Sequence, residues 1–170
     1  MAPRLLVHTR TTAYRHDSIP AAVDALRALG GFEVDASEDP AALERPLDRY
    51  AAVVFLSTSG EILTPAGRER LAAHVESGGG FVGVHAAACT EYTWPYYGEL
   101  LGARFDRHPA FQPGRVRVED RPLAWCREQG AGRVFYTALG HAAEAYADPD
   151  FRAHLLGGIT WAARLGRTGA

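Results

Sequence analysis

The segment over residues 78–87 constrains the fold of this chain more than any other. Three glycines close the element before it, a short apolar run follows, and the run ends at His85 in front of two alanines. An apolar run between a glycine stop and small residues predicts a buried strand. The pattern Gly83-Val84-His85-Ala86-Ala87 is also typical of a nucleophile elbow, where a strand turns sharply into a helix and exposes the central side chain. An imidazole then stands where an acyl-transfer enzyme carries Ser or Cys. The alternative is an ordinary hydrogen-bonded histidine at a strand end.

Strands and helices alternate from the N-terminus to this segment. The predicted strands are Leu5–Val7, Phe32–Val34, Ala51–Ser57 and the run before His85. Capping residues, prolines and glycine stops predict helices that begin at Asp17 or Ser18 and at Thr64. This alternation requires a parallel sheet with helices on both faces. We therefore expect one α/β domain over residues 1–170, with a doubly wound, mainly parallel sheet flanked by helices, as in flavodoxin-like folds.

Further elements are predicted downstream. Residues 94–101 favour a helix, and Val116 and Val118 alternate with charged residues as in a half-exposed strand. A buried strand is expected at Arg133–Thr137, and Asp148 opens a last helix with apolar residues at helical spacing.

Composition and charge exclude several classes of function. The net charge is −2 and no stretch is strongly basic, so the chain lacks the pattern of a nucleic-acid-binding protein. All 18 basic residues are arginine, which excludes a Schiff-base lysine and a Walker lysine. The apolar runs are far shorter than the ~20 residues that span a bilayer, so no membrane partner is expected. Cys89 and Cys126 form no metal-type pair and no apolar signal region opens the chain, so we expect a reducing, cytoplasmic location.

Polar clusters follow the predicted strands at the point where each strand ends. The clusters are Arg15-His16-Asp17, Thr58-Ser59-Gly60-Glu61, His85 and Gly140-His141. Because the carboxyl ends of parallel strands share one edge of a sheet, these clusters should converge. Imidazoles gathered there could hold a divalent metal ion or supply acid–base pairs near neutral pH. The candidates are His16, His85, His108 and His141, with Asp17, Glu91 and Tyr92 nearby.

These clusters also have structural interpretations. Asp17 is equally suited to capping a helix, and His74 and His154 fall on predicted helices away from this edge, where we expect them to be structural. The aromatic residues over 92–97 could form a stacking wall for a sugar ring or pack in the core. A different function is suggested by Thr9-Arg10-Thr11-Thr12, because flavodoxins bind a flavin phosphate with hydroxyl-rich loops after the first strand. This loop lacks the glycine that lets a backbone close on phosphate.

An ordered series of sequence blocks covers nearly the whole chain. The blocks are Tyr14–Pro20, Phe55–Gly60, Gly78–Ala87, Thr90–Gly98, Val116–Asp120 and Pro122–His141. In this series the chain resembles the trehalose-utilisation (ThuA-like) family, whose fold is similar to that of class I glutamine amidotransferases. Such an ordered series is more specific than any single motif.

The resemblance implies a doubly wound sheet and a role in disaccharide or keto-sugar utilisation, with a small-molecule sugar as ligand. Class I amidotransferases carry a cysteine at the elbow where this chain carries His85, so glutamine hydrolysis is not implied. The residues expected to act as bases or ligands are His85, His16, His141 and Glu91. The residues expected to bind substrate are Arg15, Thr58, Tyr92, Trp94 and His108.

One departure from the family pattern concerns the segment after Asp120. Family members carry a longer stretch before the block that opens at Pro122, whereas here Arg121 leads directly into it.

Two hypotheses about function therefore stand beside the flavodoxin alternative. The first is a carbohydrate-processing enzyme that acts on a disaccharide or its keto derivative by acid–base chemistry, with a divalent metal as an optional cofactor. The second is a non-catalytic sugar-binding or sensing module. The same loss would uncover a sheet edge, which predicts a homo-oligomer with its contact near Gly114–Arg121.

Overall fold

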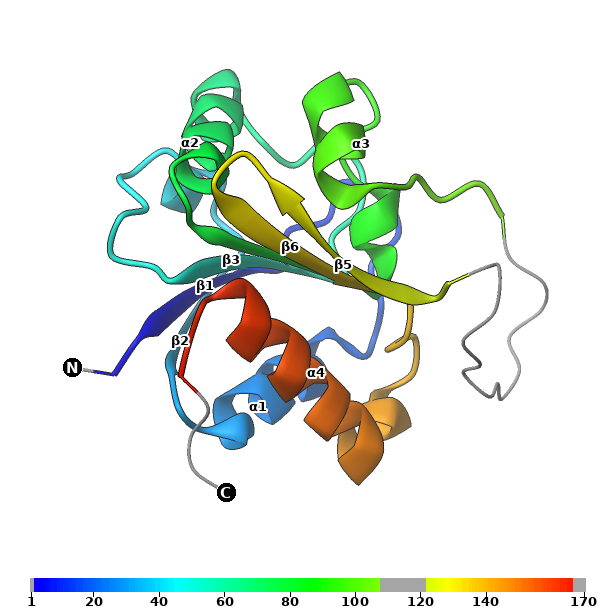
Figure 1. Ribbon diagram of the computed structural model, residues 1–170. Coiled ribbons are helices and arrows are strands. Elements are labelled where there is room, and N and C mark those ends of the chain that lie inside the picture. The colour runs from blue at the N-terminus through cyan, green and yellow to red at the C-terminus, as the bar shows by residue number, and fades with distance from the viewer. Residues whose placement is uncertain (1, 108–121, 167–170) are drawn as a thin grey trace.

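A six-stranded sheet forms the centre of the molecule (Figure 1). The computed structural model describes residues 2–107 and 122–166. The strands are β1 (Arg4–His8), β2 (Glu33–Ser37), β3 (Ala52–Leu56), β4 (Gly80–Val84), β5 (Ala124–Gln129) and β6 (Gly132–Thr137). In space they run in the order β2-β1-β3-β4-β6-β5, and all neighbours are parallel except β5 and β6. This arrangement confirms the predicted mainly parallel α/β fold.

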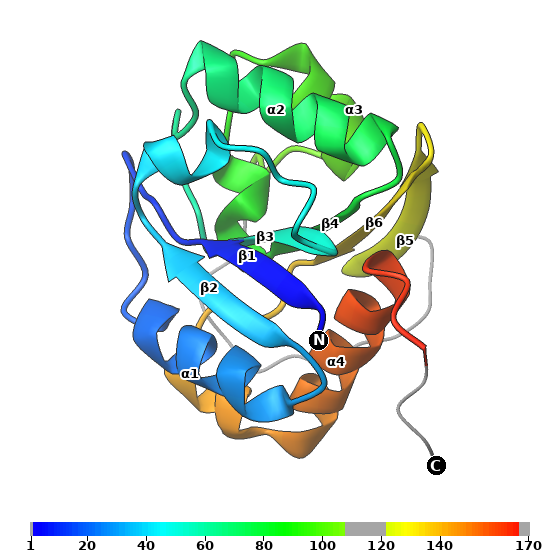
Figure 2. The ribbon, with the colours of Figure 1, turned by 90° about the vertical axis from the view of Figure 1, so that its left-hand side faces the viewer.

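Helices cover both faces of the sheet. The α-helices are α1 (Ile19–Leu29), α2 (Pro65–Glu76), α3 (Pro95–Leu101) and α4 (Pro149–Ala162), and the 3-10 turns are η1 (Pro40–Leu43), η2 (His85–Cys89) and η3 (Ala143–Ala147). Helices α1 and α4 lie on one face, and α2 and α3 lie on the other (Figures 1 and 2). No helix in the described residues combines the length and the apolarity that a membrane crossing requires.

Each face of the sheet has its own apolar core. Leu26 of α1 and Leu155 of α4 pack in the first core, and Leu71 of α2 and Leu100 of α3 pack in the second. Strands β3 and β4 are buried along their whole length, because helices cover them on both sides. Their sequences are therefore apolar without alternation, as predicted for inner strands of a parallel sheet.

The predicted helix starts are confirmed, with one difference in detail. Thr64 caps α2 and Asp148 caps α4, each accepting hydrogen bonds from amides of the first turn at 2.9–3.1 Å. At α1 neither predicted cap acts as one. Ser18 occupies the cap position, but its hydroxyl lies 3.5 Å from the carbonyl oxygen of Gly140 and makes no cap bond, and Asp17 precedes it as an exposed residue. The serine thus links the start of α1 to the loop after β6.

Two features differ from the sequence-based expectations. The antiparallel edge strand β5 was not among the predicted strands, because its residues alternate between half-buried and exposed and include the charged Arg127 and Glu128. After His85 the chain forms only the short turn η2, which ends at Thr90 with an extended backbone, and not the helix that follows a nucleophile elbow. The strand predicted around Val116 and Val118 lies outside the described residues.

Candidate functional site

Three histidines converge beyond the carboxyl ends of the strands. His16 comes from the loop between β1 and α1, His85 follows β4, and His141 lies in the loop after β6. The Nε2 atom of His85 lies 3.0 Å from Nε2 of His16 and 3.2 Å from Nδ1 of His141. The three rings meet nearly at right angles, with interplanar angles of 83–87°. Three of the sequence-predicted residues therefore form one histidine cluster, defined by His16, His85 and His141.

The backbone around His85 determines which of its nitrogens faces the cluster. Its Nδ1 lies 3.0 Å from the carbonyl oxygen of Ala138, which can only accept a hydrogen bond. In the neutral ring Nδ1 therefore carries the proton, and Nε2 presents a lone pair to His16 and His141. The Tyr136 hydroxyl in turn donates to the His85 carbonyl at 3.0 Å. The first bond joins the His85 ring to the segment after β6, and the second joins the His85 backbone to β6 itself.

Left-handed backbone conformations gather at this edge of the sheet. Ser57 after β3 has a φ of 51°, His85 after β4 has a φ of 53°, and Glu91 has a φ of 54°. Each such non-glycine residue costs on the order of 1 kcal/mol and persists only where its surroundings enforce it. The surrounding packing and hydrogen bonds therefore hold His85 in a conformation that an isolated strand end would not adopt.

His16 is held as a neutral ring. Partial burial lowers its pKa, the neighbouring His141 lowers it further, and the exposed carboxylate of Asp17 opposes both effects. The ring also meets the edge of the largely exposed Tyr14 at a centroid distance of 4.7 Å. A proton on this ring would bring a positive charge into the cluster against this burial, so the surroundings favour the neutral form.

His141 is positioned by the glycine that precedes it. Gly140 has a φ of 108°, and its carbonyl oxygen accepts a hydrogen bond from the Tyr146 hydroxyl at 3.1 Å. A Cβ atom at this position would lie 2.5 Å from the same hydroxyl. Glycine is therefore required both by the backbone angle and by the space.

Glu91 is buried, and the structure does not bring it into the histidine cluster. One carboxylate oxygen accepts hydrogen bonds from the amides of Ile62 and Leu63 at 2.7 and 2.8 Å, and the other accepts from Arg68 Nε at 2.7 Å. Its side chain is fully inaccessible to solvent. These contacts join the segment after η2 to the segment before α2, and a structural role accounts for them.

Arg15 and Thr58 lie in the two loops predicted to carry them. The exposed Arg15 guanidinium pairs with Glu38 at 2.5 Å. The hydroxyl of Thr58 is buried and lies 2.8 Å from that of Thr90. Both side chains thus have partners within the protein.

The predicted aromatic wall divides into core and surface residues. Tyr97 is completely buried and packs in the core. Trp94 stacks on Tyr96 at a centroid distance of 5.2 Å, while Tyr92 keeps 49% of its surface exposed and donates a hydrogen bond to the carbonyl of Phe105. His108 lies outside the described residues.

The loop proposed as a flavin-phosphate cradle is occupied by contacts within the protein. The amide of Thr12 donates to the carbonyl of Ser59 at 2.9 Å, and its hydroxyl donates to the carbonyl of Glu61 at 3.1 Å. Thr9 is nearly inaccessible. Two of the three threonine hydroxyls of this loop are therefore buried or bonded within the protein.

Several residues that shape the site were not recognised from the sequence. Ala138 acts through its backbone carbonyl, which leaves no mark on the side-chain pattern. Tyr136 and Tyr146 act through hydroxyls at the ends of buried rings, and their aromatic character predicts only core packing. The sequence does contain one signal for this part of the site: Gly140 directly precedes His141, and a glycine there indicates an unusual backbone angle.

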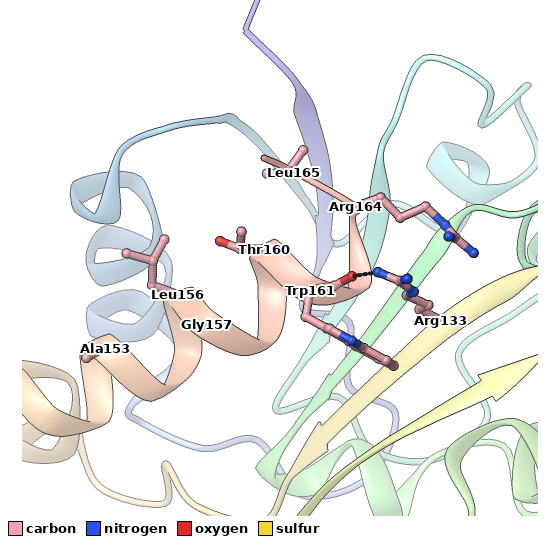
Figure 3. A pocket seen from close by; sticks show the side chains of 8 residues that line it. All are labelled: Arg133, Ala153, Leu156, Gly157, Thr160, Trp161, Arg164 and Leu165. Atoms are coloured by element: carbon pink, nitrogen blue, oxygen red, sulfur yellow. Dashed lines mark hydrogen bonds between the residues drawn. The ribbon is translucent and has the colours of Figure 1, made fainter. Parts of the chain in front are cut away.

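A shallow hollow of about 610 Å³ lies elsewhere, along α4 and beside the first residues of β6 (Figure 3). Its lining includes Leu156, Trp161 and Leu165 with two arginines, Arg133 and Arg164, and contains no acidic residue and no histidine. The histidine cluster follows the last residues of β4 and β6. The hollow therefore lies near the opposite end of β6 and is separate from the cluster.

Solved structures with this fold include ThuA-like proteins. A ThuA-like protein from Parabacteroides merdae matches 99% of this chain and 92% of its own, with 17% identity and a TM-score of 0.78. One from Bacteroides uniformis matches 99% of this chain and 94% of its own, with 18% identity and a TM-score of 0.71. A β-galactosidase from Bacillus circulans sp. alkalophilus matches 94% of this chain but only 31% of its own, with 14% identity and a TM-score of 0.64. At these identities the likeness concerns the fold alone.

The family model adds the sequence relationship that the structural likenesses lack. No curated protein matches the chain in sequence. The model described as "Trehalose utilisation" (ThuA) matches residues 4–121 and 119–162. The two stretches meet at residues 119–121, where the sequence suggests that a family segment is missing. Together they cover almost the entire chain, and the chain belongs to the ThuA trehalose-utilisation family.

Proposed function

We propose that this protein is a carbohydrate-processing enzyme of disaccharide utilisation, with the histidine cluster as its reacting centre and His85 as the central base or ligand. The family supports a role in sugar utilisation in general. The observation that carries the catalytic part is the convergence of three imidazole nitrogens around Nε2 of His85. The substrate class that fits both the family's role and an acid–base centre is a disaccharide or its keto derivative.

The hydrogen bond from His85 Nδ1 to Ala138 prepares the ring for proton transfer. It keeps the lone pair on Nε2, so a sugar hydroxyl, or a C–H next to a keto group, can give its proton to that atom. The imidazolium so formed keeps its Nδ1–H on the Ala138 oxygen, whose partial negative charge stabilises it. His16 and His141, at 3.0 and 3.2 Å, are close enough to pass the proton onward.

Two exposed residues complete the proposal. Tyr92 offers an accessible ring on which a sugar can stack. Arg15 offers a cation to an anionic or carbonyl oxygen, if substrate competes with Glu38 for it. We assign Thr58, Trp94 and His108 to the surrounding pocket as well, and Glu91 to the support of its loops.

The test compares turnover and binding of keto-trehalose by wild type and His85→Ala. The proposal expects turnover by wild type and a loss of roughly 10²-fold or more in the variant, in line with the usual contribution of a general base. Binding by both proteins with turnover by neither would instead support the sugar-binding module, which the missing family segment favours. Uptake of added flavin by the purified protein would support the flavodoxin alternative.

A further inference from the structure

Two ring nitrogens of the histidine cluster face the same lone pair of His85. Because His85 Nδ1–H is bound to Ala138, Nε2 of the neutral ring has a single in-plane lone pair. That lone pair can accept one N–H bond well, yet Nε2 of His16 and Nδ1 of His141 both lie within 3.2 Å of it. A cation that accepts lone pairs from all three nitrogens would satisfy them together.

We propose that His16, His85 and His141 form a three-histidine site for one divalent transition-metal ion of the Zn²⁺ type. Imidazole nitrogens bind Zn²⁺ at about 2.0–2.1 Å, which places two ligands of a tetrahedral ion roughly 3.4 Å apart. The observed nitrogen separations of 3.0 and 3.2 Å are close to this value, and the three ligand atoms all lie within 4.8 Å of one another. The three rings meet pairwise edge to face and are not stacked, so no ring covers another.

The support around His85 is that of a metal ligand. A ligating histidine commonly donates its other ring N–H to a carbonyl or carboxylate, which fixes the tautomer and aims the lone pair. The bond from His85 Nδ1 to the Ala138 carbonyl does this. The left-handed backbone of His85 and the Tyr136 bond to its carbonyl add to the rigidity of the ligand.

The donor set indicates the kind of ion and its role. Three neutral imidazoles without carboxylate or thiolate suit Zn²⁺, Cu²⁺ or Ni²⁺ and disfavour Mg²⁺ and Ca²⁺, which prefer oxygen ligands. No Asp, Glu or Cys in the described residues joins this ligand group. Three protein ligands leave a tetrahedral ion one open position, which is the pattern of a catalytic site and not of a structural one.

The open position would take an oxygen atom, from water or from the sugar. A bound Zn²⁺ lowers the pKa of such an oxygen to about 7 in favourable sites, so the deprotonated oxygen forms without a strong external base. This role of the ion deepens and rests on the form of the proposed function in which His85 is a ligand: its Nε2 binds the ion and does not itself take up the proton. Metal binding itself rests only on the geometry of the three histidines.

The experiment titrates chelator-treated, dialysed protein with Zn²⁺ by calorimetry. Wild type should bind one ion per chain, and Co²⁺ in place of Zn²⁺ should give the intense visible absorption of a tetrahedral site. His141→Ala and His16→Ala should each weaken Zn²⁺ binding by at least 10-fold. His154→Ala is the matched control, because it removes a histidine of α4 outside the cluster and should leave binding unchanged.

Two outcomes would overturn the metal site. One is the absence of saturable one-to-one binding by wild type, and the other is equal binding by wild type and both cluster variants when circular dichroism shows them folded. Using two variants from different loops guards against one that fails to fold. Turnover of keto-trehalose separates the metal site from the proposed function. If wild type binds Zn²⁺ but does not turn over keto-trehalose, the metal site stands and the proposed enzymatic function is wrong. If protein that binds no metal turns over keto-trehalose, the enzymatic function stands and the metal site is wrong.

Discussion

Among the single residues of the site, some positions could be predicted from the sequence and others could not. The place of His85 at a strand end could be predicted, because glycine and alanine around it mark the turn. The direction of its ring could not, since it is set by the backbone carbonyl of Ala138. The convergence of His16 and His141 could be predicted only from the parallel sheet, which brings the strand ends together.

The carboxylate of Glu91 suggested a catalytic role in the sequence, but its contacts in the structure favour a role in stability. We predict that Glu91→Gln lowers the free energy of unfolding by about 2 kcal/mol, because Arg68 loses the one of its two carboxylate partners that is fully buried. Glu61→Gln is the control, since Glu61 pairs with the same arginine at 2.8 Å but is 41% exposed and should change stability by less than about 1 kcal/mol. Urea unfolding measures both. Equal losses in the two variants would contradict the assignment.

His8 predicts a pH dependence of stability. Burial lowers its pKa from 6.5 to about 4 at the end of β1. As the pH falls, His8 of the unfolded chain binds a proton near pH 6.5, whereas native His8 binds one only near pH 4. The stability that neutral His8 gives the native state is therefore lost as the pH falls through this range. The loss should total about 3 kcal/mol and stay constant below the range.

The variant His8→Leu isolates this effect. It keeps an apolar side chain against Phe55 and removes the titrating group. The difference in unfolding free energy between wild type and variant should shift in favour of the variant between pH 6.5 and about pH 4. A pH-independent difference would show that native His8 takes up a proton as readily as the unfolded chain does.

At the scale of elements, the central strands and capped helices were predictable and the edge of the sheet was not. Strand β4 and helix α2 are bounded by glycines, Thr64 and a proline, so local sequence determines them. Strand β5 is half-exposed, and only its hairpin partner β6 selects it as a strand. Such an element has a weak local signal because tertiary pairing stabilises it.

Two glycines of adjacent elements should respond oppositely to alanine. A Cβ atom on Gly80 in β4 would lie 2.6 Å from the backbone oxygen of Ala162, so Gly80→Ala should destabilise the fold by roughly 1–3 kcal/mol. A Cβ atom on Gly157 in α4 would have no atom of the described residues within 4 Å, so Gly157→Ala should stabilise by about 0.5–1 kcal/mol. Thermal unfolding of both variants checks the signs. Loss of stability at Gly157 would indicate a close neighbour on that face of α4.

At the scale of the whole molecule, the sheet ends in two edges. In the described part of the chain, β2 and β5 occupy them. Unpaired strand edges favour association with another chain unless they are covered or charged. The segment Gly114–Arg121, where we expect the contact, lies outside the described residues, so its place in the interface is a prediction from the sequence alone.

We predict a homodimer or larger assembly at micromolar concentration, to be measured by light scattering. Arg117→Pro should weaken it, because proline removes a backbone donor from the expected strand. A monomer mass for wild type would contradict the association itself. A dimer that survives Arg117→Pro would place its contact on another part of the molecule.

We propose that His16, His85 and His141 act as one reacting centre on a sugar. The most direct measurement is kcat/KM for keto-trehalose in the three single alanine variants and the triple variant, each checked for folding. Groups that act as a unit are strongly non-additive, so each single change should cost nearly as much as the triple change, on the order of 10²-fold or more. Single variants that retain wild-type activity, or losses that simply multiply in the triple variant, would contradict the claim.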